Sequence, residues 1–381
     1  MTIRNYWRDN RGDLIMVAFF LIISAGLSQL TLFRAPANQT GVKVKSTVLS
    51  VDNRGIEPHG FVTVGFQDVK LKVIEGAYAG KEFVAKNNLR GRTDVDKMFV
   101  PGDIALAAIQ ISPDGTVIQV NAQDHYRIGR ELCLFAIFGL LLLAFCGWIG
   151  VKAILSFVFA CLVIWKLVMP LCMLGYNPII VSLLAVLLLA AAIIFLVAGL
   201  TAKGVTAFCG TVLGLLSSCV LGMIFTDSFR IDGAVMPYSQ ALFFAGFEYL
   251  RLTDIYIGAI FLASSGALMD LAMDVAAGMK EVAVQRPDIP RRELMFSGFR
   301  IGRLVVGTMT TTLLLAYSGG YLTMLMTFAA EGVGPVDFLN YPYVASEVVR
   351  TLVGSIGLLL VAPFTALVGS IILSAKSSRR L

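Results

Sequence analysis

A series of apolar runs, each long enough to cross a lipid bilayer, constrains this chain more than any other feature. A helix needs about 20 apolar residues to span a hydrocarbon core roughly 30 Å thick. We expect membrane-spanning helices at these positions: 14–33, 132–148, 152–172, 179–200, 204–225, 254–280, 302–327 and 347–374. Composition agrees, because 57% of the 381 residues are hydrophobic and only 15% are charged. The sequence predicts an α-helical polytopic membrane protein of about eight transmembrane helices.

The segment 34–130, which follows the first apolar run, has a different character. Its short alternating or β-branched runs are KVKSTVLSV, GFVTVGF, VKLKVI, EFVAK, DIALAAIQI and TVIQVNA, and turn sequences such as VDNRG and SPDG separate them. Six short strands in so few residues predict a small β-barrel or sandwich, with an OB-like barrel favoured. Because aromatic residues are sparse on these strands, a docking or plugging role is favoured over oligomer binding. The expected organisation is a cytosolic N-terminus with the first helix (1–33), the β domain (34–130) and a seven-helix membrane domain (131–381).

Charge placement gives the expected orientation, because lysine and arginine concentrate on cytosolic connections. The connection 328–346 carries Glu331 and Asp337 and neither lysine nor arginine. We therefore expect cytosolic N- and C-termini, an extracytoplasmic β domain, and a net charge of +6 that reflects insertion rather than nucleic-acid binding. The basic residues expected in the cytosol are Lys152, Lys203, Lys280, Arg286, Arg291, Arg292, Arg300, Lys376, Arg379 and Arg380.

Cysteine and histidine usage narrows the chemistry. The six cysteines lie in or beside apolar runs without a CxxC pair, which is typical of small buried hydrophobes. The two histidines, His59 and His125, lie outside the expected spans, which excludes an intramembrane Ser–His dyad or a His-rich metal site. No nucleotide-binding loop is present, so energy would come from an ion gradient or another subunit. No cofactor is expected.

Two aspartates interrupt the sixth apolar run. Asp270 and Asp274 are four residues apart and share one helical face, with Gly266 one turn earlier. Carboxylates near a bilayer centre are costly, so this face must meet protein, water or an ion. The next run enters from the cytosol, and its Thr308 and Thr312 share a face at a depth comparable to that of the aspartates.

Three interpretations of the aspartates compete. They could bind a cation or relay protons, with the threonine hydroxyls completing an oxygen-rich site. They could instead be structural, with Arg303 or Lys166 neutralising them. A catalytic dyad like that of intramembrane aspartyl proteases is disfavoured, because that pattern uses two helices and a GxGD motif. We therefore expect no enzymatic activity.

Polar and small residues also mark the last run. Glu347 and Arg350 stand at i, i+3 and can pair with each other. Gly354 allows close helix packing, and Pro363 is expected to kink the helix. Helices that are polar, interrupted and closely packed in this way are typical of transporters.

Three stretches resemble the YibE/F-like family of multi-pass bacterial membrane proteins: GALMDLAMDVAAGMKEV, ELMFSGFRIGRLVVGTMTTTLLLAY and ASEVVRTLVGSIGLLLVAPFTAL. The resemblance extends back into the β domain through IEGAYAGKEFVAKNNL and VPGD. The family motif GAxMDxAM maps its aspartate onto Asp270, and IGRDxxGTMxNTLxLAY includes Arg303. This sequence departs from the second motif at Leu304, where the family tends to have aspartate, and at Thr311, where it tends to have asparagine. The resemblance implies a bacterial plasma-membrane protein of eight spans.

Together these features predict a transporter or permease for a small solute or ion. Asp270, Asp274, Thr308 and Thr312 would form its intramembrane site. The alternative is a non-transporting membrane scaffold, or an envelope-assembly subunit, whose external β domain docks a partner. Expected partners are the lipid bilayer and either a second copy or another subunit.

Overall fold

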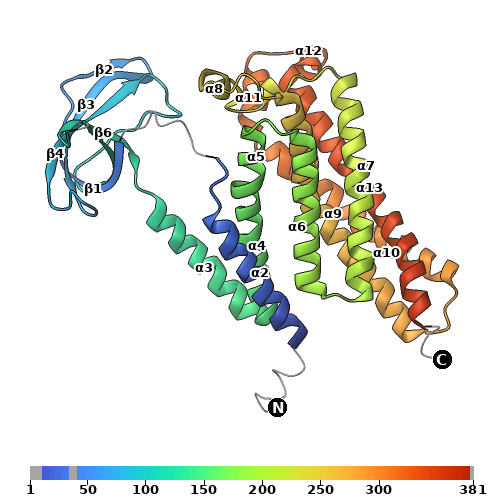
Figure 1. Ribbon diagram of the computed structural model, residues 1–381. Helices are drawn as coiled ribbons and strands as arrows, with labels where there is room; N and C mark the ends of the chain where they lie inside the picture. Colours follow the sequence, from blue (N-terminus) through green and yellow to red (C-terminus); the bar gives the residue numbers. More distant parts are fainter. Residues whose placement is uncertain (1–10, 34–40, 113, 378–381) are drawn as a thin grey trace. The chain divides into compact units, whose positions relative to one another are not determined.

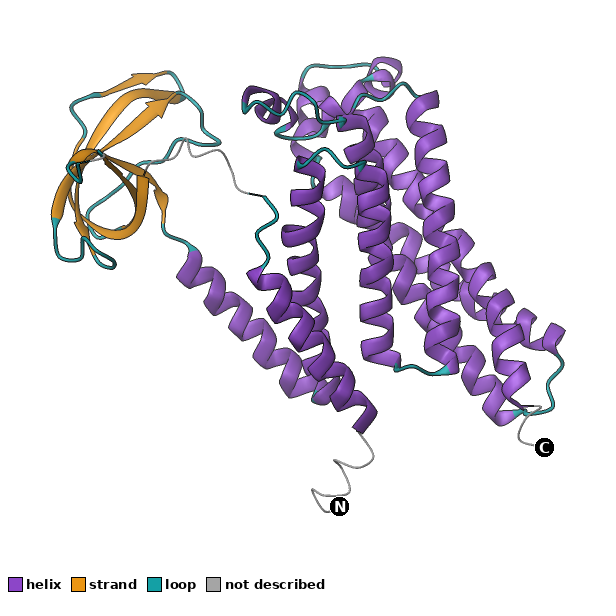
Figure 2. Ribbon diagram, viewed as in Figure 1, coloured by secondary structure: helices purple, strands orange, loops and turns teal. Residues whose placement is uncertain are grey.

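A computed structural model describes residues 11–33, 41–112 and 114–377 of the chain (Figure 1). The expected cytosolic residues Arg379 and Arg380 lie outside this part. The described chain divides into two compact units, which are taken separately below. The barrel unit is residues 34–144, and the helical unit is residues 1–33 together with 145–381. Figure 2 shows the strands gathered in the barrel unit.

The barrel unit contains a six-stranded sheet followed by one long helix, α3 (Ile128–Cys146). Two expected strands, GFVTVGF and VKLKVI, merge into one, and IEPH pairs with it as an additional short strand. Gly65, at a φ of 104°, lets the backbone pass through the point where a break was expected. The strands are β1 (Gly41–Asp52), β2 (Ile56–His59), β3 (Val62–Val73), β4 (Glu82–Arg90), β5 (Ile104–Ile111) and β6 (Val117–His125).

Five of these strands close into a barrel. The sheet order is β1-β5-β6-β4-β3-β2, and β1 also pairs with β3. β1 pairs with β5 through its first half and with β3 through its second half, so it joins the two edges. The strands alternate as a barrel requires, with Leu71, Ala85 and Ile109 fully buried in the interior. The prediction of a small β-barrel is confirmed.

A buried polar pair fastens the connection between β4 and β5 to the barrel. Gln67 is fully buried, and its Nε2 donates to the carbonyl oxygen of Phe99 at 2.9 Å while its Oε1 accepts from the amide of Phe99 at 3.0 Å. Asn87 Nδ2 donates to the carbonyl oxygen of Lys97 at 2.6 Å. Because buried amides must find partners, these bonds hold the connection against the barrel and seat Phe99 in its core.

The helical unit is built from long helices joined by short turns. Its helix starts follow local rules: Asn177 accepts from the amide of Ile179 at 2.9 Å before α6, and Thr201 caps α7. Its elements are α2 (Arg11–Gln29), α4 (Trp148–Val163), η1 (Ile164–Val168), α5 (Met169–Met173), α6 (Pro178–Ala198), α7 (Ala202–Ser228), η2 (Gly233–Val235), α8 (Ser239–Phe244), α9 (Leu252–Gln285), α10 (Arg291–Gly319), α11 (Leu322–Ala330), α12 (Pro335–Asn340) and α13 (Pro342–Ser377).

α9 is the central helix of this unit and packs against α6, α7, α10 and α13. Glycines let the helices approach closely: a Cβ on Gly258 would lie 3.0 Å from the Cβ of Ser182 in α6, and one on Gly214 of α7 would lie 3.3 Å from Leu268. The buried core runs along α9 from Tyr256 to Met279. α2 packs instead on α4, where the rings of Phe20 and Phe159 are 5.3 Å apart.

Seven of the described helices are long and apolar enough to cross a membrane. The expected first span is represented by the apolar stretch Leu14–Gln29, which is shorter than the others. The third expected span is a helix interrupted by the π-helical turn η1, because Pro170 lacks an amide for the α-helical ladder and its ring crowds the preceding turn. The seventh was expected to reach residue 327, but α10 ends at Gly319, where two adjacent glycines weaken the helix.

Candidate functional site

The middle of α9 carries the two carboxylates on an exposed side. The helix has 34 residues, so its midpoint lies between Leu268 and Met269. Asp270 lies about 2 Å beyond this midpoint and Asp274 about 8 Å beyond it, at 1.5 Å per residue. Both side chains are exposed, whereas the opposite side of α9 is buried in the core. The exposed residues Ala263, Gly266, Asp270, Asp274 and Ala277 are called the open face of α9.

The register between α9 and α10 fixes what lies beside this open face. A Cβ on Gly278 would lie 2.7 Å from Ile301 Cδ1, and one on Gly302 would lie 3.6 Å from Val275. The two helices run antiparallel, so each step back along α9 corresponds to one step forward along α10. Asp270 therefore lies at the level of Thr308, and Asp274 lies at the level of residues 303–305.

The threonines turn toward the same side. Thr308 and Thr312 follow Ile301 by seven and eleven residues, which brings them to the side of α10 that contacts α9. Both are exposed, as are the carboxylates. Asp270, Asp274, Thr308 and Thr312 thus line adjoining edges of the two helices, with Thr312 about one turn beyond Asp270.

The hydroxyl groups act as acceptors toward this surface. Thr308 Oγ1 donates to the carbonyl oxygen of Val305 at 3.0 Å, and Thr312 Oγ1 donates to that of Thr308 at 3.1 Å. With each hydroxyl proton engaged by its own helix, the remaining lone pairs can only accept. The surface therefore presents carboxylate and hydroxyl oxygens, which suit a cation or a solute rich in hydrogen-bond donors. Within the described residues, no group of three or more His, Cys, Asp or Glu is placed to hold a metal ion.

The two expected counter-charges lie elsewhere. Arg303 is exposed and follows Ile301 by two residues, which turns it to the side of α10 away from α9. Lys166 Nζ donates to the carbonyl oxygen of Leu30 at 3.1 Å, beside α2. Across residues 11–33, 41–112 and 114–377, Asp270, Asp274 and Arg303 form no ion pair.

A second polar cluster lies near the other end of α9. Arg350 Nη1 and Glu347 Oε1 are 3.2 Å apart, and their side chains are only 18% and 16% exposed. The pairing expected from their i, i+3 spacing is present. Tyr256 of α9 donates from its hydroxyl to the carbonyl oxygen of Ser346 at 2.5 Å, and the Arg350 guanidinium lies 5.9 Å from the centre of its ring. Tyr256 is roughly 20 Å from Asp270 along the helix, so the cluster is separate from the carboxylates.

An apolar cavity of about 260 Å³ adjoins this cluster. Its lining includes Tyr317, Tyr321 and Glu347. In the described chain, Glu347 Oε2, Arg350 Nε and Tyr317 Oη are buried without a hydrogen-bond partner. The sequence interpretation did not foresee the tyrosines around the ion pair. The sequence did contain an indication of them: a buried tyrosine hydroxyl needs a polar partner, and these tyrosines lie in or beside apolar runs.

The remaining predicted residues lie in helix contacts or on the surface. A Cβ on Gly354 would lie 3.2 Å from the Cβ of Ser264, so α9 and α13 meet closely there. Gly266 has no atom within 4 Å of its Cβ position, which leaves this part of the open face uncovered. α13 continues as one helix through Pro363.

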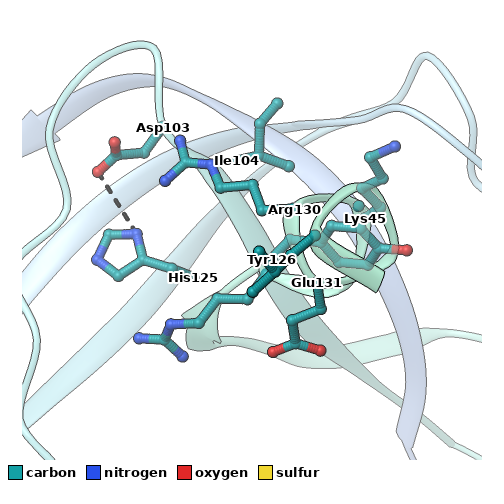
Figure 3. Close-up of a pocket in the computed structure, with 10 residues that line it drawn as sticks. Lys45, Asp103, Ile104, His125, Tyr126, Arg130 and Glu131 are labelled. Atoms are coloured by element: carbon teal, nitrogen blue, oxygen red, sulfur yellow. Dashed lines mark ion pairs between the residues drawn. The ribbon is translucent and has the colours of Figure 1, made fainter. Parts of the chain in front are cut away.

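The barrel unit contains a pocket of about 710 Å³ where the barrel meets the first turn of α3. Figure 3 shows Asp103 and His125 on one side of this pocket and Lys45 on the other. His125 Nδ1 lies 3.7 Å from Asp103 Oδ2, and Lys45 Nζ lies 3.0 Å from Glu75 Oε1. Charges of both signs line the pocket, so it lacks the single-sign field expected of a dedicated ion site.

Comparison with known proteins identifies the family. No curated protein and no solved structure matches the chain. A profile of the family described as YibE/F-like protein matches residues 134–375. The match begins within α3 and ends within α13, and it includes the open face of α9 and the Glu347–Arg350 pair. The β-barrel precedes it. Because this match spans more than half of the chain, the protein belongs to the YibE/F-like family.

Proposed function

We propose that this protein is a membrane-embedded permease for a small cation or a donor-rich solute such as an amine. The single observation that carries the proposal is the pair Asp270 and Asp274, which are exposed near the middle of a 34-residue apolar helix and have no counter-ion among the residues that the structure describes. Ionisable groups inside membrane-spanning helices are rare and mark substrate pathways, ion pathways and proton relays. The adjoining acceptor oxygens of Thr308 and Thr312 select for positive charge or for donors.

The proposed setting is a bacterial plasma membrane with both termini in the cytosol. The start of α2, the turn between α6 and α7, the turn between α9 and α10 and the end of α13 lie at one end of the helical unit (Figure 1). Lys203, Arg286, Arg291 and Arg292 lie at or near those turns, as expected for a cytosolic surface. Glu331 and Asp337 lie in the connection at the other end. In the proposed setting the barrel unit lies outside the cytosol.

The test is flux into proteoliposomes that contain the full-length protein. Radiolabelled sodium, rubidium and methylammonium serve as probes, and an entrapped pH-sensitive dye reports protons. Asp270→Asn should lower the flux of the transported probe about tenfold or more, because a charge-assisted contact is worth roughly 1.5–3 kcal/mol. Glu331→Gln, which removes an exposed carboxylate from the connection after α11, is the matched control and should leave the flux unchanged.

Two results would count against this function. One is equal flux through wild-type and Asp270→Asn protein that inserts and folds equally well by circular dichroism and gel filtration. The other is an absence of flux above empty liposomes for all four probes. An Asp270→Asn protein that fails to fold would assign the aspartate to the structure instead, and Asp270→Glu, which keeps the charge, would then be expected to restore folding without transport.

The pocket in the barrel unit favours a second candidate, a scaffold whose barrel docks a partner. Its polar lining is accessible and lies next to α3. Arg130→Ala together with Glu131→Ala would then abolish assembly with that partner while the barrel stays folded. Normal assembly of this variant, measured by co-purification from the native membrane, would remove the scaffold role of the pocket.

A further inference from the structure

The outward surfaces of α9 and α10 are the open face of α9 and the exposed side of α10 that carries Arg303, Leu304, Gly307 and Leu315. They combine charge with exposed apolar side chains. Only 11% of the 18-residue apolar stretch of α10 is buried, whereas 61% of the corresponding stretch of α9 is buried. Leu304 is 79% exposed and Leu315 is 65% exposed. They extend the open face of α9 across α10, so that Asp270 and Asp274 stand within a surface otherwise suited to hydrocarbon. Lipid chains offer carboxylates no partner, so a membrane-embedded protein must cover this surface.

Among residues 11–33, 41–112 and 114–377, no basic side chain forms an ion pair with Asp270 or Asp274. Arg303 faces away from α9, and Lys166 is engaged at Leu30. The helix of the barrel unit, α3, has its charged residues Arg130 and Glu131 in its first turn and only apolar residues from there to its end at Cys146. The apolar part of α3 therefore contains no basic residue that could neutralise a carboxylate.

A second copy does offer the missing charge at the right depth. Copies inserted in the same orientation associate around an axis along the membrane normal, so equivalent residues keep the same depth in both. The register of α9 and α10 puts Arg303 and Asp274 of one chain at the same level but on different sides of the helix pair. When two such surfaces face each other across a two-fold axis, the α10 side of one copy lies against the α9 side of the other. Each Arg303 then lies opposite the Asp274 of the other copy.

Small residues permit the close contact that this arrangement needs. The open face contains Ala263, Gly266 and Ala277, spaced about one helical turn or a multiple of it apart. Gly307 of α10 is also exposed, with no atom within 4 Å of its Cβ position. Small residues at this spacing let membrane helices approach each other without loss of side-chain entropy. The surface therefore carries both complementary charge and close-packing residues.

We infer that the protein forms a homodimer through the outward surfaces of α9 and α10, in which Asp274 of each copy pairs with the partner's Arg303. Asp270, Thr308 and Thr312 are then enclosed between the two copies, and the carboxylate site is complete only in the dimer. The inference rests on the proposed membrane embedding of these helices. It goes beyond the proposed transport, because the pairing also holds in a protein that moves no solute.

Cysteine cross-linking in native membranes tests the contact directly. Leu304 lies between the two charges on the outward surface, close to the expected two-fold axis. Leu304→Cys should give a disulfide-linked dimer on mild oxidation. Leu359→Cys is the matched control, because Leu359 is 55% exposed and lies at the same depth on α13, outside the proposed interface. The control should remain monomeric on a non-reducing gel, as should the wild-type protein with its native cysteines.

A charge swap tests the pairing itself. Asp274→Arg and Arg303→Asp should each lower the Leu304→Cys cross-linked fraction at least fivefold, and the combined variant should restore it. Restoration by a second disruptive substitution has no explanation in terms of general misfolding. Equal cross-linking at Leu304 and Leu359, a disulfide from Leu304→Cys to Cys133 or Cys146 of the same chain, or a combined variant no better than the single ones would overturn the dimer. Flux measured in proteoliposomes that contain the same variants separates the two ideas. Cross-linking without flux refutes only the permease, and flux without cross-linking refutes only the dimer.

Discussion

Removing one partner of the Glu347–Arg350 pair should destabilise the helical unit far more than removing both. The two side chains are more than four-fifths buried and 3.2 Å apart. At that distance and an effective dielectric constant of about 20, Coulomb attraction is about 5 kcal/mol before desolvation is subtracted. Arg350→Met leaves an unpaired carboxylate among Tyr256, Tyr317 and Tyr321, and Glu347→Leu leaves an unpaired guanidinium. Each should lower the free energy of unfolding by about 3–5 kcal/mol.

The double variant Glu347→Leu/Arg350→Met should behave differently. It removes both charges and adds apolar side chains beside an apolar cavity, so its cost should be within about 1 kcal/mol of zero. Unfolding by sodium dodecyl sulfate in mixed micelles, followed by circular dichroism, gives the four free energies of the cycle. Their coupling should exceed about 2 kcal/mol.

Arg286→Met supplies the control for this cycle. Arg286 and Glu293 are 3.5 Å apart, but their side chains are 59% and 56% exposed. Breaking this surface pair should cost less than about 1 kcal/mol. Additive costs at Glu347 and Arg350, or equal costs at the buried and exposed pairs, would refute the view that burial makes the first pair interdependent.

Two further predictions concern helix packing and the pH dependence of the barrel. Gly210→Ala would place a Cβ 2.9 Å from the Cα of Thr365, so the contact between α7 and α13 should open. Thermal unfolding should show that the free energy of unfolding falls by about 1–3 kcal/mol. Gly26→Ala is the control and should be neutral or slightly stabilising, because there is free space around Gly26. In the barrel, hydrogen bonds from Arg54 lower the pKa of Asp52 from 3.8 to about 2. The ionised Asp52 side chain therefore stabilises the folded barrel above about pH 4, and this stabilisation is lost as the pH falls from about 4 to 2. Carbon-detected NMR of the full-length protein should show the Asp52 midpoint near 2, and Arg54→Ala should return it to about 4; an unchanged midpoint would exclude Arg54 as the cause.

Elements with strong local patterns could be predicted from the sequence. The apolar runs marked the long helices, and the alternation of DIALAAIQI marked β5, because period and length depend on neighbouring residues alone. Breaks inside the helices were harder. Pro170 was visible, but its position did not show that the helix continues past it through a π-helical turn. The end of α10 at Gly319 was also missed. Two adjacent glycines end the helix there, but the apolar residues that follow them made the run look continuous.

The polar sites depended on contacts that no spacing reveals. The i, i+3 relation of Glu347 and Arg350 was sufficient to predict their pairing, because both lie on one helix. The tyrosines around them come from α9 and from the end of α10, so predicting them requires the register between helices. That register depends on which glycine of one helix contacts which side chain of the next. The same holds for Gln67 in the barrel. A glutamine at an inward-facing position breaks the expected alternation of apolar and polar residues along the strand. Its burial is explained only by its hydrogen-bond partner, the backbone at Phe99.

The double pairing of β1 has a consequence for how the chain is made. The second half of β1 finds its partner within the next twenty or so residues, since Ser46 pairs with Val73. Its first half must wait for β5, where Gly41 meets Gln110. At about 5–20 residues per second, the ribosome takes several seconds to produce that partner. During this interval the nascent chain carries a strand with one free edge and a valine-rich surface. Synthesis that pauses before Ile104 should therefore leave a form prone to aggregation, and faster translation of this segment should improve the yield of folded protein.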